Sequence, residues 1–300
     1  MITIIYDKIE PPKEFVPFLR KFNTHEINII IAPTFDYKSP IGIRYMPTFI
    51  SLIKKLSGRK FRTSYRFSEI LHSLNLSENR RSDFEMAISI MATLWLNNNL
   101  NLIDYFGRIA DALKIEFKIY PLTDPPLLVL VETESGRVPP YKIYEGEVEF
   151  SKIRQISFNG VDKIKVPSEV KKVFEESNKV ILYQPSVITV KLLNELEEFQ
   201  KILQSHSGTI IYLLPDKINP VDSAILAREG LSQDWTGLIE MIHKGVDVIV
   251  FDENKTGILE AATKYQIAFF PISYDVETKE GVNKFVESLL KILSLNSSRK

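Results

Sequence analysis

Short aliphatic runs, each five to seven residues long, recur along the chain and alternate with amphipathic segments. The runs are Ile2–Tyr6, Ile27–Pro33, Leu127–Glu132, Lys179–Tyr183, Thr209–Pro215, Asp247–Glu253 and Ile267–Ile272. Several of them are continuously apolar, which is typical of strands buried on both faces of a parallel sheet. The sequence therefore predicts an α/β fold, a Rossmann-like, doubly wound and mainly parallel sheet.

The pattern changes to helices between about residues 58 and 113, where apolar residues recur at intervals of three and four. We therefore expect a single domain over residues 1–300 with a helical insert subdomain in that range. Trp95 lies among Leu and Phe residues at helical spacing. These aromatic side chains predict either core packing or a contact between protomers, which leaves a homo-oligomer open.

Composition excludes several classes of protein. Lys and Arg together number 38, as do Asp and Glu, so no overall field attracts nucleic acid. The absence of cysteine excludes disulfides and cysteine zinc sites. No secretory leader pattern opens the sequence, and no apolar run reaches the roughly 18 residues of a membrane span. We expect a cytoplasmic protein with neither a membrane nor a nucleic-acid partner. The Ile and Lys content suits an archaeal thermophile.

Loops that follow the strands are the place to look for chemistry, because ligands of doubly wound sheets bind beyond the carboxyl ends of the strands. Asp36 follows the second run, and Asp124 stands before Pro125 in a later loop. Asp124 is also a good turn residue, and Asp36 could equally cap a helix or form a salt bridge with Lys38 or Arg44. The two carboxylates together could hold a cation, although divalent metals prefer more oxygen ligands.

Three segments, in this order and spacing, resemble the 2-phospho-L-lactate transferase (CofD-like) family. They are "YFGRIADALKIEFKIYPLTDPPLLVLVETESG" (Tyr105 to Gly136), "ISFNGVDKIKVPSEVKKVFEESNKVILYQPSVIT" (Ile156 to Thr189) and "GVDVIVFDE" (Gly245 to Glu253). The resemblance implies a transferase of coenzyme F-420 biosynthesis. Such an enzyme moves a phospholactyl-type group from a guanosine diphosphate adduct to a deazaflavin alcohol.

The resemblance also suggests which residues form the site. Asp36 and Asp124 become the candidates for catalysis and, if any metal binds, for its ligands. The candidates for ligand binding are Lys13, Arg44, Ser186 and Thr189. Ser186 and Thr189 could donate to a phosphate and could equally cap the helix that follows. No cofactor is indicated from the residues alone, and Mg²⁺ is expected only if the chain is active.

Departures from the family pattern are concentrated in its phosphate loops. The family's "GGTG" loop after the first strand reads "YDKIEPPK" here, with only Lys13 kept. Its "GDxDxAT" motif reads "AISIMAT", with Ile88 and Ile90 in place of acidic residues. Tyr183 stands roughly where a glycine would admit a nucleotide phosphate. Only 12 of the 300 residues are glycine, and the chain contains neither GG nor GxG, which excludes a glycine-rich phosphate loop.

Two functions remain open. In the first, the chain is a degenerate homologue that keeps the scaffold and acts through binding or assembly, as a pseudoenzyme. In the second, it is an active phospholactyl-type transferase, or a related enzyme for a nucleotide-diphosphate ligand, with a rebuilt site. The ligands expected are a small phosphorylated molecule or a deazaflavin.

Overall fold

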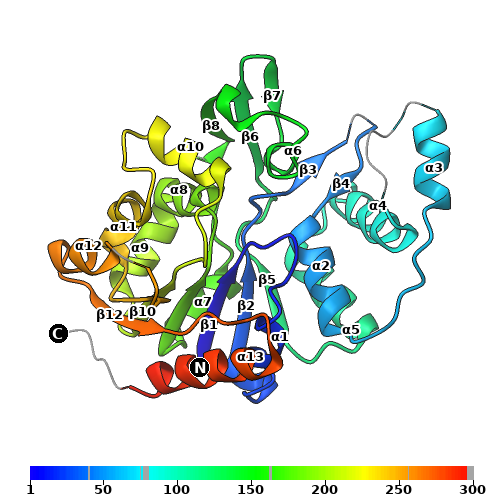
Figure 1. Cartoon of the computed structure of the whole chain (residues 1–300). Helices are drawn as coiled ribbons and strands as arrows, with labels where there is room; N and C mark the ends of the chain where they lie inside the picture. The colour runs from blue at the N-terminus through cyan, green and yellow to red at the C-terminus, as the bar shows by residue number, and fades with distance from the viewer. Residues whose placement is uncertain (40, 75, 77–80, 162–163, 256, 296–300) are drawn as a thin grey trace.

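A seven-stranded sheet forms the centre of the molecule, in the order β12-β11-β10-β9-β1-β2-β5 (Figure 1). The computed structural model describes residues 1–39, 41–74, 76, 81–161, 164–255 and 257–295. The strands of this sheet are β1 (Ile2–Tyr6), β2 (Ile27–Ile31), β5 (Lys118–Pro121), β9 (Lys179–Tyr183), β10 (Thr209–Leu213), β11 (Val248–Asp252) and β12 (Ala268–Ile272). All of its neighbouring strands pair in parallel. The predicted Rossmann-like α/β fold is confirmed.

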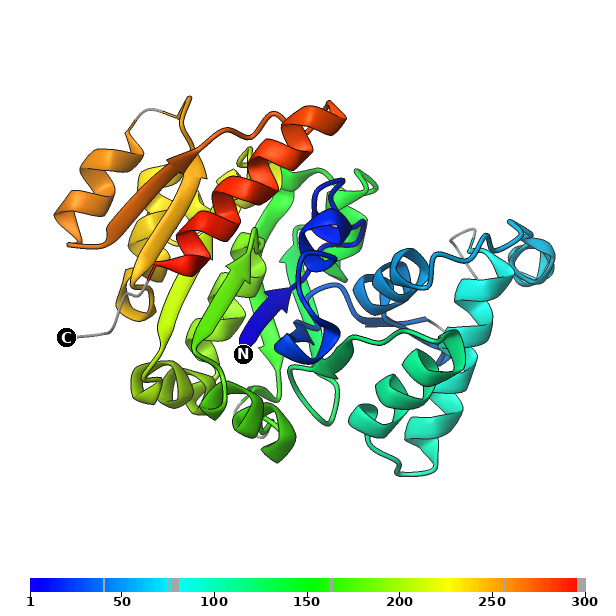
Figure 2. The same cartoon turned by 90° about the horizontal axis from the view of Figure 1, so that it is seen from below.

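Helices cover both faces of the sheet (Figures 1 and 2). Those of the first part of the chain are α1 (Phe15–Leu19), α2 (Pro47–Leu56), α3 (Arg66–Ser73), α4 (Asp83–Asn97), α5 (Leu102–Leu113) and α6 (Pro140–Tyr144). Those of the second part are α7 (Ser168–Glu175), α8 (Val187–Glu195), α9 (Glu197–Ser205), α10 (Pro220–Arg228), α11 (Trp235–Ile242), α12 (Ile258–Lys264) and α13 (Lys279–Ser294). Short 3₁₀ turns lie at η1 (Thr24–Glu26), η2 (Phe150–Lys152) and η4 (His243–Gly245).

Two apolar cores lie on opposite faces of the sheet because successive side chains of a strand point in opposite directions. Ile4 and Tyr6 of β1 belong to one core, together with residues of α1, α5 and α13. Ile5 of β1 belongs to the other, with residues of α7 to α12. Strands that supply both cores are buried on both faces, which explains why their sequences are almost entirely apolar.

The order of the strands reverses next to β1. Going along the chain, β2 and β5 extend the sheet on one side of β1, whereas β9, β10, β11 and β12 extend it on the other. β1 therefore pairs with both β2 and β9, with Ile4 opposite Ile29 and Ile181. The switch between β1 and β9 is where ligands of this fold class usually bind.

The aliphatic run at Leu127–Glu132 does not belong to the central sheet. It forms β6 (Leu128–Thr133), which pairs in an antiparallel manner with β7 (Gly136–Val138) and β8 (Ile153–Asn159). Val129, Val131 and Thr133 are buried, whereas the alternate residues are only half-buried. The expectation of a strand buried on both faces is wrong here. Burial alternates along this strand, but the half-buried residues Leu128 and Leu130 are also apolar, so the sequence does not show the alternation.

α2 to α5 lie beyond β5 in the view of Figure 1, and β6 to β8 with α6 lie above the sheet. A small antiparallel ribbon, β3 (Tyr37–Lys38) and β4 (Arg44–Tyr45), runs between these two groups. α4 begins at a capping box in which Glu85 N donates to Ser82 Oγ and Ser82 N donates to Glu85 Oε2. The expected helical insert at residues 58–113 contains α3, α4 and α5.

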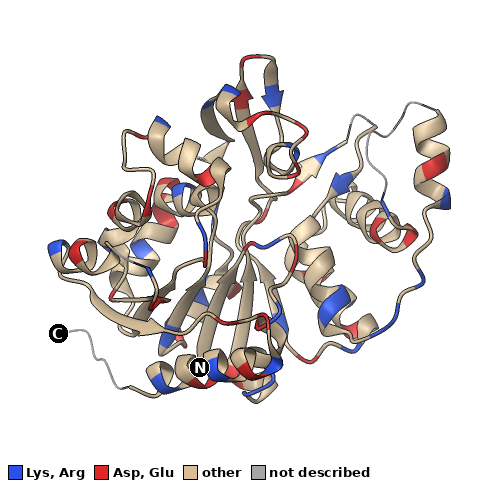
Figure 3. Cartoon of the chain, viewed as in Figure 1, with Lys and Arg blue, Asp and Glu red and all other residues tan. Residues whose placement is uncertain are grey.

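Acidic and basic residues are interspersed on the same elements throughout the described chain (Figure 3). Of the helices built from described residues, none combines the length and the apolar character that crossing a bilayer requires.

Candidate functional site

The N-terminus of α8, at the switch between β1 and β9, holds a carboxylate from a distant part of the chain. Asp7 directly follows β1, and its side chain is fully buried. Its Oδ2 accepts three hydrogen bonds, from Ser186 N at 2.8 Å, Ser186 Oγ at 2.7 Å and Thr189 Oγ1 at 2.7 Å. Thr34 Oγ1 forms a further hydrogen bond with Thr189 Oγ1. One oxygen of Asp7 thus occupies the position where a helix N-terminus binds an anion.

A second carboxylate completes the capping of this helix. Asp222, in the first turn of α10, accepts a hydrogen bond from Val187 N at 2.9 Å and another from the Tyr144 hydroxyl at 2.7 Å. Asn219 Nδ2 donates to its other oxygen at 2.6 Å. Burial raises the pKa of Asp222, while the bonds from Tyr144 and Val187 oppose that rise. The first amides of α8 therefore have partners within the protein.

Ser186 is the N-cap residue of α8, because its Oγ accepts from Thr189 N at 3.2 Å. The same hydroxyl donates to Asp7, so the cap and the carboxylate form one network. Both predicted ligand residues, Ser186 and Thr189, are brought together here and are buried. Their hydroxyls are engaged with groups of the protein.

The side chain of Tyr183 does not lie at the N-terminus of α8. The ring packs in the opposite core, 4.6 Å from the ring of Phe15, and the hydroxyl donates to Glu14 Oε1 at 3.2 Å. Since Leu182 belongs to the core on the α8 side, Tyr183 must point to the other face of β9. The position is closed by Asp7, the residue that stands at the start of the loop without glycines.

Asp36 and Arg44 form a second buried polar group. Asp36 is 5% exposed, and burial raises its pKa to about 7 although the positive charge of Arg44 pulls it down. Burial in turn lowers the pKa of the Arg44 guanidinium. Arg44 N donates to Thr93 Oγ1 at 2.8 Å, which ties β4 to α4. Nη1 of Arg44 is buried and has no hydrogen-bond partner among the described residues.

Asp124 lies in different surroundings. Its Oδ2 accepts a hydrogen bond at 3.2 Å from Leu102 N, at the N-terminus of α5. Burial raises the pKa of Asp124, the bond from Leu102 lowers it, and the nearby carboxylates of Glu169 and Asp104 raise it. Arg44 is the charged group that acts on Asp36, whereas Glu169 and Asp104 are those that act on Asp124.

Lys13 lies at the surface. Its Nζ is 2.5 Å from Glu277 Oε2, and the two side chains are 63% and 81% exposed. Among described side chains, no group of three or more His, Asp or Glu residues is arranged to hold a metal ion.

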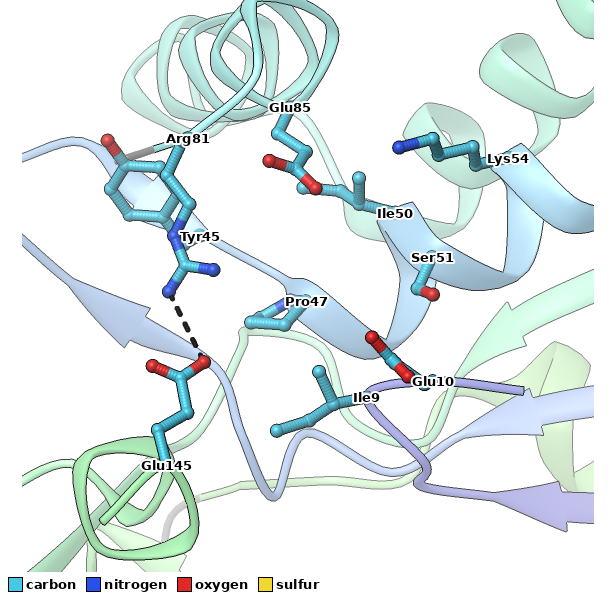
Figure 4. A pocket seen from close by; sticks show the side chains of 10 residues that line it. All are labelled: Ile9, Glu10, Tyr45, Pro47, Ile50, Ser51, Lys54, Arg81, Glu85 and Glu145. Atoms are coloured by element: carbon cyan, nitrogen blue, oxygen red, sulfur yellow. Dashed lines mark ion pairs between the residues drawn. The ribbon is translucent and has the colours of Figure 1, made fainter. Parts of the chain in front are cut away.

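A pocket of about 220 Å³, which we call the cleft pocket, lies between α2, β4, the start of α4 and the end of α6 (Figure 4). Ten residues line it, and they include two cations, Arg81 and Lys54, and three carboxylates, Glu10, Glu85 and Glu145. Arg81 lies over the rings of Tyr37 and Tyr141, at 6.0 and 5.6 Å from their centroids. Cation–π contacts of this kind hold a guanidinium in place.

The sequence did not single out Asp7, Asp222 or Arg81. A signal existed for Asp7, which directly follows the first buried strand in the stretch that replaces the family's glycine loop. Asp222 looks like an ordinary acidic residue in a helix first turn, and Arg81 like a solvated residue before a capping box. Neither has a sequence signal that distinguishes it, because their partners come from distant segments.

Comparisons with known proteins point in one direction. A 2-phospho-L-lactate transferase of Methanosarcina acetivorans is 24% identical over 198 residues, which are 63% of this chain and 63% of that protein. One from Haloarcula marismortui is 22% identical over 255 residues, 83% of this chain and 72% of that protein. The first match therefore spans less than two thirds of its relative's length. No family model matches the chain.

Two solved structures of a UPF0052 family protein from Bacillus halodurans share the fold, with TM-scores of 0.63 and 0.61 at 12% identity. Each alignment covers 96% of this chain, and 99% and 98% of the two solved chains. The order of motifs, the fold and these relatives agree. The chain is a divergent, CofD-like relative of the 2-phospho-L-lactate transferases.

Proposed function

We propose that this chain keeps the scaffold of the CofD-like proteins, does not transfer a group from a nucleotide-diphosphate adduct, and acts through binding. The proposal rests on one observation: Asp7 Oδ2 takes three hydrogen bonds at the N-terminus of α8. A phosphate placed there would lie against this carboxylate and would repel it. In a buried, low-dielectric position, such repulsion between like charges costs several kcal/mol.

The capping by Asp222 supports the same proposal. A diphosphate would compete with Asp222 for Val187 N and with Asp7 for Ser186 N. Both carboxylates come from loops and turns at the carboxyl end of the sheet, on either side of α8. Displacing them would leave buried charges without hydrogen bonds, which is strongly unfavourable.

A working transferase is the second candidate, and the observation that favours it is Asp36. A carboxyl with a pKa of about 7 is well matched to accept a proton at neutral pH, and Arg44 beside it carries the charge needed to stabilise a leaving phosphate. In that case Asp36 would take the proton of the attacking hydroxyl. Asp124 and Ser186 would contribute to the site from their loops.

Calorimetric titration with guanosine diphosphate, with and without Mg²⁺, separates the two candidates. We expect no heat from the wild-type protein at micromolar concentrations and no phospholactyl transfer to a deazaflavin alcohol from its guanosine adduct. Wild-type affinity in the micromolar range would refute the closure of the α8 N-terminus by Asp7, and product formation would refute the absence of group transfer.

The Asp7→Gly variant makes the test sharper because it removes the competing carboxylate and restores a small residue. We expect inorganic phosphate to raise the Tm of this variant and to leave the Tm of the wild-type protein unchanged. Asp124→Gly is the matched control, since it also frees a helix N-terminal amide but lacks the Ser186 and Thr189 hydroxyls. A folded Asp7→Gly protein that ignores phosphate would show that Asp7 is not what closes the position.

A further inference from the structure

The cleft pocket presents charges of both signs that the protein itself does not neutralise. Pro47, Ile50, Ser51 and Lys54 line it from α2, at the spacing of three and four residues that places side chains on one helix face. Lys54 forms no ion pair with any described residue. Glu10, in the exposed loop after β1, likewise has no cationic partner in the part of the chain that the structure describes. One cation and one carboxylate of the lining are thus left without an ion-pair partner among the described residues.

The opposite end of the pocket is fixed in place. Arg81 is held by the rings of Tyr37 and Tyr141, and its Nη2 lies 3.9 Å from Glu145 Oε1. Figure 4 shows the other terminal nitrogen of Arg81 turned toward the interior of the pocket. Glu85 is held by the capping bond from Ser82 N at 2.8 Å, and its carboxylate lies between Arg81 and Lys54 in Figure 4. These groups need little reordering to receive a ligand.

The charge pattern selects the class of ligand. A simple dianion would face three carboxylates as well as the two cations, and a simple amine would face both cations. A zwitterion can place each of its charges beside the opposite sign. Apart from Ser51, the uncharged lining is formed by Ile9, Tyr45, Pro47 and Ile50, whose mainly apolar surface suits an uncharged, apolar side chain.

The size of the pocket narrows the choice further. Its volume of about 220 Å³ is below the roughly 300–1,000 Å³ of pockets for drug-sized ligands. We propose that the cleft pocket binds a small zwitterion of the α-amino acid class with an apolar side chain. Its carboxylate lies toward Lys54 and its ammonium lies toward Glu10, the two charged lining groups that have no ion-pair partner among the described residues.

This inference rests on the proposed binding role, for which it names a ligand. It concerns the cleft pocket and not the N-terminus of α8. A failure to bind amino acids leaves the closure by Asp7 intact, and a nucleotide bound at α8 leaves the pocket to be tested separately.

The test uses the twenty standard L-amino acids as probes of the full chain, first by thermal shift at millimolar concentration and then by calorimetry. We expect at least one apolar amino acid to bind. Its N-acetyl form and its decarboxylated amine should bind about tenfold more weakly or not at all, since each lacks one charge-assisted contact. The absence of binding by all twenty, or equal binding of the analogues, would overturn the proposal.

Variants locate the site. Lys54→Gln and Glu10→Gln should each weaken the affinity for the amino acid about tenfold. Lys55→Gln is the matched control, because Lys55 is the next residue of α2, is exposed, and does not line the pocket. An affinity that falls equally in Lys54→Gln and Lys55→Gln would place the binding elsewhere and contradict the proposal.

Discussion

The N-terminus of α8 and the cleft pocket are both polar, yet they treat their charges in opposite ways. At the N-terminus of α8 the anions are the protein's own carboxylates, Asp7 and Asp222. Both are buried and accept hydrogen bonds from the first amides of the helix. In the cleft pocket, Lys54 and Glu10 face the space without an ion-pair partner among the residues described. The first arrangement favours stability, and we propose that it excludes an external anion. The second leaves electrostatic energy available to a ligand.

Truncation of the buried carboxylate should give the largest effect on stability. Asp7→Ala leaves the buried Ser186 N without its acceptor and leaves the Ser186 and Thr189 hydroxyls only their bonds to each other and to Thr34, at a cost of about 3 kcal/mol in the free energy of unfolding. Urea denaturation measures this loss. Asp111→Ala, at an exposed position of α5, is the control and should change stability little. A loss below about 1 kcal/mol for Asp7→Ala would remove the contrast between the two regions.

Asp36 is an intermediate case, buried like Asp7 but without its set of donors. Its pKa is about 7 in the folded protein against 3.8 for the free group, so the folded protein keeps a proton that the unfolded chain releases. Wild-type stability should therefore fall as pH rises from about 4 to about 7, by up to about 1.4 kcal/mol per pH unit. Asp36→Asn should flatten this dependence.

Urea midpoints of Asp36→Asn and wild type across that pH range check the prediction. Asp111→Asn serves as the control, because an exposed carboxylate should leave the slope as it is in the wild type. Identical slopes for Asp36→Asn and wild type would mean that Asp36 is ionised in the folded protein near pH 5.

The smallest effect is expected in the cleft pocket. Lys54→Gln removes a charge that has no ion-pair partner among the described residues, so the free energy of unfolding should stay within about 0.5 kcal/mol of the wild type. Denaturation without added ligand is the measurement. A large destabilisation would indicate that Lys54 stabilises the fold, and the two regions would then differ less than we describe.

The sequence predicted the architecture well because burial on both faces leaves a direct mark on composition. Nearly continuous aliphatic runs such as Ile27–Ile31 are typical of inner strands. The run Leu127–Glu132 was assigned to the central sheet because its half-buried leucines give the same pattern. The sequence does not show toward which face a side chain at a strand end points. Tyr183 was therefore expected near the phosphate position at the N-terminus of α8, where Asp7 lies instead.

The site was less predictable because its contacts join remote segments. Asp7 and Ser186 are 179 residues apart, and Tyr144 and Asp222 are 78 apart. The residues next to Asp7 in the sequence do not indicate that its carboxylate contacts α8. The family resemblance drew attention to Ser186 and Thr189 and to the missing glycine loop. It did not indicate that the Asp7 carboxylate lies against both of these side chains.

The adjacency of β1 and β9 has a consequence for how the chain matures on the ribosome. β1 is synthesised first, but its second neighbour, β9, is synthesised only after more than half of the chain. Until Thr189 has emerged, the carboxylate of Asp7 remains hydrated and one edge of β1 is open to other pairing. The pairing of β1 with β9 and the contact of Asp7 with α8 therefore cannot form until well over half of the chain has been synthesised.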